Sequence, residues 1–119
     1  METRPATIIC DIDGTLVYHT TPDQASKPTY KMAIIEGTIN KLLEWERNGY
    51  RIILLTGRKE SLRDVTIQQL KEIGIFYDQL IMGVGGGKRY LINDCKTNGE
   101  YSAYAINIKR NKGIKDIEI

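Results

Sequence analysis

The sequence has little excess charge of either sign, and this bears on the partners to expect. Its 119 residues include 17 Lys and Arg against 15 Asp and Glu, which gives a formal charge of +2. A protein that binds nucleic acid usually carries a strong basic patch. The densest basic cluster here is Lys109 to Lys112, in a charged C-terminal tail that we expect to be solvated. We therefore expect no nucleic-acid partner.

The sequence also lacks a long apolar run and a secretion signal. Residues 1–5 contain no apolar segment of the signal-peptide kind, and no run approaches the ~20 residues that a membrane helix needs. We expect a cytoplasmic protein with no membrane partner. The two cysteines, Cys10 and Cys95, form no Cys-x-x-Cys pair, which argues against a zinc or redox motif. We expect both to be small buried packing residues, with a regulatory disulfide between neighbouring strands as the alternative.

The overall composition is typical of a folded domain. Charged residues make up 27% and hydrophobic residues 41% of the chain, close to the average for globular proteins. A chain of 119 residues is long enough for one core but not for a second domain of ordinary size. We expect a single domain over residues 1–119, with minimal or no cap and a polar, turn-rich flap over about 17–31.

Apolar runs alternate with helical periodicity along the chain. The runs predict strands at residues 6–10, 51–56, 80–82, 90–92 and 104–108. Between them, helical spacing predicts one helix capped by Thr38 and ended by Gly49, and another capped by Ser61 and ended by Gly74. This alternation predicts an α/β protein with a mostly parallel sheet and helices on both faces, a three-layer α/β/α Rossmann-like sandwich.

Polar residues follow three of the predicted strands. They are Asp11 and Asp13 after the first run, Thr56 at the end of the second, and Asn93-Asp94 after the fourth. Ligands of open parallel sheets bind beyond the carboxyl ends of the strands. We therefore expect these three segments to meet at one site. The simpler alternative is that Asp13-Gly14 makes a turn and caps the following segment.

The residue types at this edge are those of a phosphoryl site. Asp11 and Asp13 lie two steps apart on an extended strand, roughly 7 Å, and their repulsion would be relieved by a cation between them. Magnesium binds one or two carboxylates together with substrate phosphate. The Thr56 hydroxyl and the Gly57 backbone N–H suit phosphate oxygens. Asp11 is a candidate nucleophile.

These motifs resemble the haloacid dehalogenase superfamily of phosphatases that use an aspartate nucleophile. The resemblance lies in Asp-Ile-Asp-Gly-Thr-Leu at 11–16, in an apolar strand that ends in Thr-Gly-Arg, and in the Asn-Asp strand end. It implies Asp11 as nucleophile and magnesium ligand, and Asp13 as general acid and base with a backbone metal ligand. It also implies Thr56 as phosphoryl binder and Asp94 as third metal contact.

Two positions depart from the pattern of this superfamily. Asn93 stands where an acid is common, which implies weaker metal binding. The resemblance also implies a lysine near the phosphoryl group, for which Lys88 is the first candidate and Arg58, Lys59 and Lys96 are alternatives. The glycine-rich segment that ends at Arg89 is not a nucleotide-binding P-loop, because Arg89 stands where Ser or Thr should bind magnesium.

The sequence thus predicts a magnesium-dependent phosphatase that hydrolyses a small phosphate monoester through an aspartyl-phosphate intermediate. The segments around the last motif also resemble those of capless relatives linked to sugar phosphates, so a small phosphorylated metabolite such as a sugar phosphate is the expected partner. A non-catalytic phosphate-binding or partner-binding module is the alternative, and a receiver-like signalling domain is a third. We expect self-association into a homo-oligomer to shield the site from water.

Overall fold

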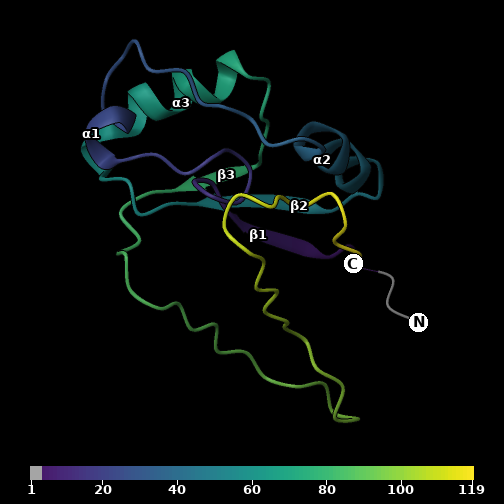
Figure 1. The fold of residues 1–119 in the computed structure, drawn as a ribbon. Coiled ribbons are helices and arrows are strands. Elements are labelled where there is room, and N and C mark those ends of the chain that lie inside the picture. Colours follow the sequence, from purple (N-terminus) through teal and green to yellow (C-terminus); the bar gives the residue numbers. More distant parts are fainter. Residues whose placement is uncertain (1–3) are drawn as a thin grey trace.

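The computed structural model describes residues 4–119 and contains a three-stranded parallel sheet (Figure 1). The strands β1 (Thr7–Asp11), β2 (Arg51–Leu55) and β3 (Gln79–Ile81) lie in the order β1-β2-β3. Cys10 pairs with Leu54, and Leu54 in turn pairs with Leu80. The predicted α/β class, the Rossmann-like fold and the parallel sheet are confirmed, and the first three apolar runs form its strands.

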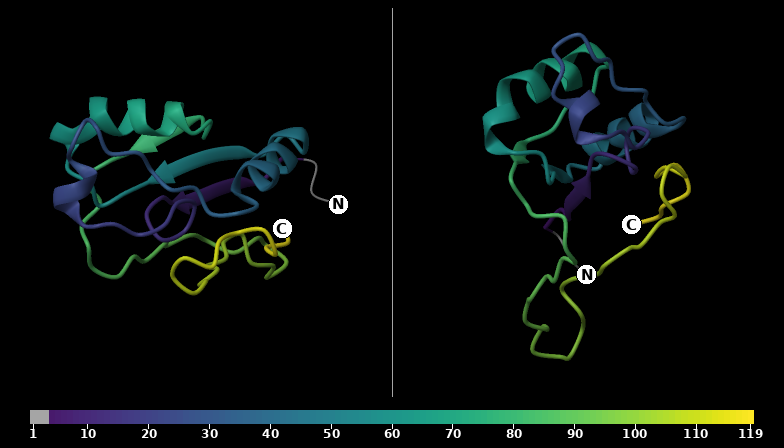
Figure 2. Two further views of the ribbon diagram at one scale, coloured as in Figure 1. Left: turned by 45° about the horizontal axis from the view of Figure 1, so that its top comes forward. Right: turned by 60° about the vertical axis from the view of Figure 1, so that its left-hand side comes forward.

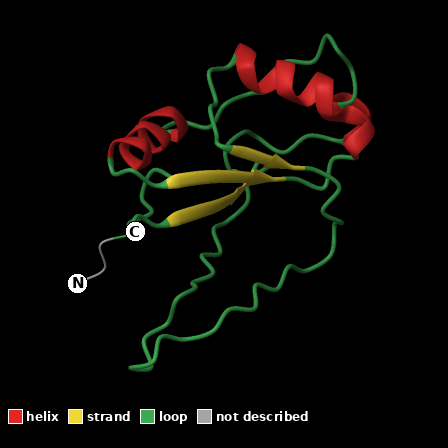
Figure 3. Cartoon of the chain, turned by 180° about the vertical axis from the view of Figure 1, so that it is seen from behind, coloured by secondary structure: helices red, strands yellow, loops and turns green. Residues whose placement is uncertain are grey.

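The helices lie on one face of the sheet. They are α1 (Pro22–Ala25), α2 (Thr38–Arg47) and α3 (Arg63–Glu72), with a 3₁₀ turn η1 (Glu60–Leu62) before α3. Because the strands follow one another in chain order, two right-handed crossovers place α2 and α3 on the same side (Figure 3). The predicted third layer is not formed, because no helix among residues 4–119 covers the other face, where Ile9 and Ile81 are nearly half exposed. No helix in this part of the chain is long and apolar enough to span a bilayer.

The core lies between the sheet and the helices. Alternate strand residues point to this side, so Ile8 and Cys10 are buried whereas Thr7 and Ile9 are exposed. Trp45 of α2 and Leu70 of α3 pack in the same cluster and are almost fully buried. The sheet is therefore buried on one face, which is why β2 shows alternating burial although its sequence is uniformly apolar.

The predicted C-terminal ends of the two long helices are confirmed, whereas the predicted N-terminal caps are wrong. Gly49 and Gly74 both have positive φ, 77° and 81°, and end α2 and α3 as expected. Thr38 does not cap α2, because Gly37 occupies that position and the Thr38 hydroxyl donates instead to the carbonyl of Leu16 at 2.9 Å. Ser61 does not cap α3 either, since it lies within the 3₁₀ turn that precedes the helix.

Residues 85–108 form a long arm whose two ends lie against the body of the fold and whose middle projects away from the sheet (Figure 2). The predicted strands at 90–92 and 104–108 are not formed, because neither segment pairs with another strand in the described chain. Tyr90, Ile92 and Tyr104 are 83%, 93% and 74% exposed. The arm accounts for a radius of gyration of 15.0 Å, above the ~13.5 Å of a compact chain of this length.

The chain returns from the arm to the body of the fold near the first strand. The Asn111 N–H donates to the carbonyl of Gly14 at 2.8 Å, and the Asn111 side chain accepts from the His19 N–H at 2.8 Å. Ile114 is then buried in the core. These contacts hold the C-terminal segment beside the turn that follows β1, so residues from distant parts of the sequence border the same site.

Candidate functional site

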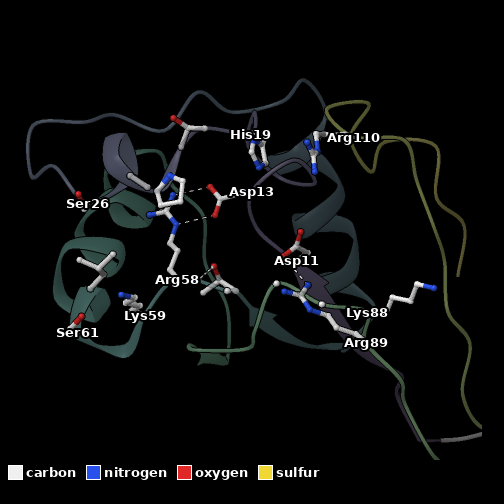
Figure 4. A pocket seen from close by; sticks show the side chains of 18 of the residues that line it. Asp11, Asp13, His19, Ser26, Arg58, Lys59, Ser61, Lys88, Arg89 and Arg110 are labelled. Carbon is white, nitrogen blue, oxygen red and sulfur yellow. Dashed lines mark hydrogen bonds and ion pairs between the residues drawn. The ribbon is translucent and has the colours of Figure 1, made fainter.

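A pocket lies at the carboxyl ends of β1 and β2 (Figure 4). Two of the three strand ends predicted to meet are found there, with Asp11 and Asp13 from the first and Thr56 and Gly57 from the second. The flap contributes part of the wall and the arm contributes another. The remaining charged or polar side chains that line it include His19, Arg58, Lys59, Lys88, Arg89, Asn107 and Arg110.

Asp11 is the last residue of β1, and its side chain is 36% exposed. One carboxylate oxygen accepts from Arg89 Nη1 at 3.2 Å, and the other accepts from the Thr15 hydroxyl at 3.4 Å. Both contacts are long for hydrogen bonds to a charged group. Asp11 is therefore accessible from the pocket and carries a positive neighbour. Arg89 was considered in the sequence only as the residue that rules out a P-loop, and its contact with Asp11, 78 positions away, was not predicted.

Asp13 is held by a two-point ion pair with Arg58. Arg58 Nε donates to Asp13 Oδ2 at 3.0 Å, and Nη2 donates to Oδ1 at 2.8 Å. The Arg58 side chain is only 5% exposed and that of Asp13 is 20% exposed. A bidentate pair of this kind fixes the orientation of a carboxylate as well as neutralising it. Asp13 and Asp11 thus face different cations, one buried and one partly exposed.

Arg58 is bonded to protein on every side of its guanidinium. Its third nitrogen, Nη1, donates to Gln69 Oε1 at 2.7 Å and to the Thr66 hydroxyl at 3.4 Å, both on α3. The sequence predicts Arg58 as a phosphate ligand, but the structure places it behind Asp13 and anchors it to the helix. Gln69 and Thr66 were not predicted, because mid-helix polar residues carry no local signal that they are buried.

Thr56 and Gly57 form a tight turn at the end of β2. Thr56 is 1% exposed, and its hydroxyl accepts from the Arg58 N–H at 3.1 Å. A Cβ at Gly57 would lie 3.1 Å from the carbonyl oxygen of Val84, which is closer than a side chain normally approaches. Glycine lets the segment after β3 pass close beside the turn, and a Cβ here would push the Val84 carbonyl back by a few tenths of an ångström. Both residues line the pocket, as their predicted role in phosphate binding requires.

The candidate cations are distributed unevenly. Lys59 and Lys88 line the pocket, together with Arg89 and Arg110. Figure 4 shows the Lys88 side chain pointing away from Asp11, with Arg89 nearer to that carboxylate. Lys96 lies outside this pocket, in a second hollow on the arm. Of the four predicted phosphate-binding cations, three therefore reach the pocket wall and one does not.

Asp94 does not join Asp11 and Asp13. It lies in the second hollow with Cys95, Lys96 and Asn98, next to the Asn93 side chain. The predicted meeting of a third strand end is thus not found. The reason is that the segment before Asp94 is part of the projecting arm and pairs with no strand of the sheet.

The residues at the pocket fit a magnesium ion that is held by few protein ligands. No group of three or more acidic, His or Cys side chains suited to a metal occurs within residues 4–119. Both oxygens of Asp13 already accept from Arg58, whereas Asp11 is more exposed. Magnesium keeps several waters and is satisfied by one or two carboxylates together with substrate phosphate. The accessible Asp11 carboxylate meets that requirement.

The two cysteines have different surroundings. Cys10 is buried as predicted, and desolvation together with the neighbouring Asp11 charge raises the pKa of its thiol to about 12. Cys95 is exposed on the arm, so the prediction that it is buried is wrong. Both are free thiols, and no disulfide links them. His19 lies on the pocket wall in the flap.

Comparison with known proteins gives one matching family. The family described as "Polynucleotide kinase PNKP phosphatase domain" matches residues 5–90. A chain from the "Structure of Pnkp1/Rnl/Hen1 complex" is 27% identical with a TM-score of 0.57, and the match covers 75% of this chain and 32% of that one. A chain from the "Structure of the Pnkp1/Rnl/Hen1 RNA repair complex" is 30% identical with a TM-score of 0.54, covering 66% and 25%.

A third solved structure, from Vibrio cholerae, is 20% identical with a TM-score of 0.52, covers 81% of this chain and 77% of its own, and shows the same fold. No curated protein matches the sequence. This chain spans only 32% and 25% of the first two structures, so it corresponds to one part of each.

The expectation of no nucleic-acid partner is wrong in light of these matches. The matching family is part of a polynucleotide kinase, and one matched chain belongs to an RNA repair complex. The expectation rested on the small net charge of the whole chain and on the interpretation of the Lys109 to Lys112 cluster as a solvated tail. Residues 86–112 alone contain six Lys and Arg against two Asp and Glu. The basic residues are concentrated beside the pocket and along the arm, and a whole-chain sum hides that concentration.

Proposed function

Because the chain belongs to the family of polynucleotide kinase phosphatase domains, within the haloacid dehalogenase superfamily, we propose that it removes a terminal phosphate from a polynucleotide strand. The observation that carries the proposal is the pocket at the ends of β1 and β2. It places Asp11 and Asp13 beside Thr56 and Gly57 under a basic rim. A polynucleotide end replaces the sugar phosphate as the leading substrate, since the matching family is one of polynucleotide enzymes.

Asp11 is the nucleophile of the proposed reaction. Its carboxylate oxygen attacks phosphorus, a bond forms between them, and the bond from phosphorus to the strand oxygen breaks. Asp13 gives a proton to that leaving oxygen and later takes one from the water that hydrolyses the aspartyl phosphate. Each Asp13 oxygen keeps a second lone pair while it accepts from Arg58, so the ion pair leaves room for the proton. The products are inorganic phosphate and restored Asp11.

Magnesium is the proposed cofactor. The Asp11 carboxylate and the Asp13 backbone carbonyl would hold it together with the substrate phosphate. When bound, it would offset the negative charge of the phosphoryl group. Asp94 is outside the proposed site, since it lies in the separate hollow on the arm.

The remaining pocket residues are proposed to bind the phosphate and the strand. The Thr56 hydroxyl and the Gly57 N–H face the phosphoryl oxygens, and Lys59 and Arg110 offset their charge. Tyr90 lies on the pocket rim and is 83% exposed, which suits it to stack on a base. The basic residues of the arm would then contact backbone phosphates beyond the reacting end. Residues 17–31 act as the flap over this site within one domain.

Phosphate release from defined substrates tests the proposal. Short single strands of DNA and RNA with a phosphate at either end are compared with sugar phosphates and p-nitrophenyl phosphate, each with and without magnesium. We expect the highest kcat/KM on one class of strand end, with a decline as salt increases because phosphate contacts are screened. Asp11→Asn is the inactive control. Turnover of sugar phosphates without turnover of any strand would overturn the proposed substrate class. Binding of a strand or a phosphate without any turnover would favour the non-catalytic module.

A further inference from the structure

Gln69 lies in the middle of α3, and its side chain is almost completely buried. Its amide nitrogen donates to the carbonyl oxygens of Ala25 at 3.0 Å and Lys27 at 3.3 Å. Its amide oxygen accepts from Arg58 Nη1 at 2.7 Å. The two carbonyls can only accept and the guanidinium can only donate, so these partners determine which way the amide is turned.

A buried glutamine at this position is costly unless its polar atoms are satisfied. Leu70, the next residue, shows that the helix buries apolar side chains close by. Gln69 instead joins three separate segments through hydrogen bonds: α3 itself, the carbonyls at the end of the flap helix α1, and the arginine after β2. A leucine would fill similar space but would leave two carbonyls and one guanidinium nitrogen without these bonds.

The bonds continue from Gln69 to the proposed acid. Arg58 uses Nη1 for Gln69 and its other two nitrogens for both oxygens of Asp13. Without Gln69, the remaining partner of Nη1 is the Thr66 hydroxyl at 3.4 Å, which is a weak contact. A buried guanidinium with an unsatisfied donor is expected to rotate toward another acceptor. Rotation of the guanidinium would turn the Asp13 carboxylate with it, since the two are joined at two points.

We propose that Gln69 is a positioning residue that, through Arg58, holds Asp13 in the orientation for proton transfer and ties that orientation to the flap. The inference rests on the proposed phosphatase function and adds a residue to it. When residues 25–27 are seated on α3, Gln69 is fully bonded and Asp13 is aligned. The backbone of residues 25–27 is thereby linked, through Gln69 and Arg58, to the Asp13 carboxylate.

The test uses the dependence of rate on the leaving group. A substrate series of aryl phosphates spans good leaving groups, which need little protonation, to poor ones, which need it most. Gln69→Leu and the similarly sized Gln69→Met are compared with wild type. Gln68→Leu and Gln68→Met are the matched controls, because Gln68 is the neighbouring exposed residue on the same helix and its side chain donates to Glu72, away from the pocket.

We expect the Gln69 variants to lose ~10-fold or more in kcat on the poorest leaving groups, part of the 10²–10⁴ that general acid catalysis contributes, and little on the best. The Gln68 variants should follow wild type across the series. Adding Arg58→Ala to Gln69→Leu should cause little further steepening, because both act through one chain of contacts. Circular dichroism verifies folding, and the two Gln69 variants offer alternative packing if one fails to fold.

The outcomes separate this inference from the function on which it rests. If wild type hydrolyses the aryl phosphates but Gln69 variants lose the same factor on every leaving group, Gln69 has only a structural role and the inference is wrong. Full additivity of Arg58→Ala and Gln69→Leu would also overturn it. If wild type hydrolyses none of them or the strand ends, the proposed function fails first and the inference fails with it.

Discussion

The ion pair between Asp13 and Arg58 is predicted to stabilise the fold as well as to orient an acid. Asp13→Ala removes both acceptors of a guanidinium that is 5% exposed, and no other acidic side chain is hydrogen-bonded to Arg58 in the described structure. Breaking one partner of a fully buried pair costs about 3–5 kcal/mol, because a charge stays buried without compensation. Asp13 is 20% exposed, so water reaches part of the site and the cost should lie at or just below the lower end of that range.

We therefore expect Asp13→Ala to lower the free energy of unfolding by about 2–3 kcal/mol. For a chain of this length, that corresponds to a fall in Tm of roughly 8–12 °C. Urea denaturation followed by circular dichroism measures the free energy, and a thermal scan checks the second value. Asp13→Asn should cost less, since the amide oxygen still accepts one of the two bonds.

Asp23→Ala is the matched control for this measurement. Asp23 pairs with Lys27 at 3.7 Å on the surface of the flap, where both side chains are more than half exposed. A pair of that kind contributes ~0–1 kcal/mol. If Asp13→Ala costs no more than Asp23→Ala, the buried pair does not stabilise the fold and the reasoning from burial is refuted. A higher free energy of unfolding for Asp13→Ala than for wild type would show that the Asp13 carboxylate destabilises the fold.

Three further predictions follow from single contacts. Asp11→Asn should abolish turnover, because the nucleophile is lost. Asp13→Asn should accumulate a phosphoryl group on the peptide that contains Asp11, which mass spectrometry after acid quench detects. Full turnover by Asp11→Asn, with deamidation excluded, would contradict the nucleophile assignment. Gly57→Ala should lower the free energy of unfolding by ~1–2 kcal/mol, because its Cβ would meet the Val84 carbonyl at 3.1 Å. The same displacement of the turn should lower kcat/KM. If neither quantity changes, the segment around Val84 moves aside without cost. Iodoacetamide at pH 8 should label exposed Cys95 and spare Cys10, since the pKa of about 12 keeps that thiol protonated until the pH approaches 12; equal labelling of both would show that Cys10 is accessible.

Local features of the sequence correctly predicted three of the strands, the helix ends at glycine and the polar ends of β1 and β2. The runs that became β1, β2 and β3 are apolar and short, and Gly49 and Gly74 mark the ends of α2 and α3 through their positive φ. Asp11, Asp13 and Thr56 were predicted to meet because parallel strands that are joined by helices end at the same edge. The strands, the helix ends and the polar strand ends were each predicted from residues close together in the chain, and the parallel arrangement of the strands then brings two of those ends together.

Contacts between distant residues decided the rest. Arg58 was predicted to face phosphate, yet it faces Asp13, which is 45 positions away, because Gln69 and Thr66 of α3 hold it there. Tyr90 to Ile92 have the composition of a strand, but a strand forms only where a neighbouring backbone supplies its hydrogen bonds. That segment has no such neighbour in the described chain, so Asp94 lies on the arm while Arg89 contacts Asp11. The composition of a segment determines which secondary structure and contacts are possible for it, and the backbone and side chains that the fold places beside it determine which of them form.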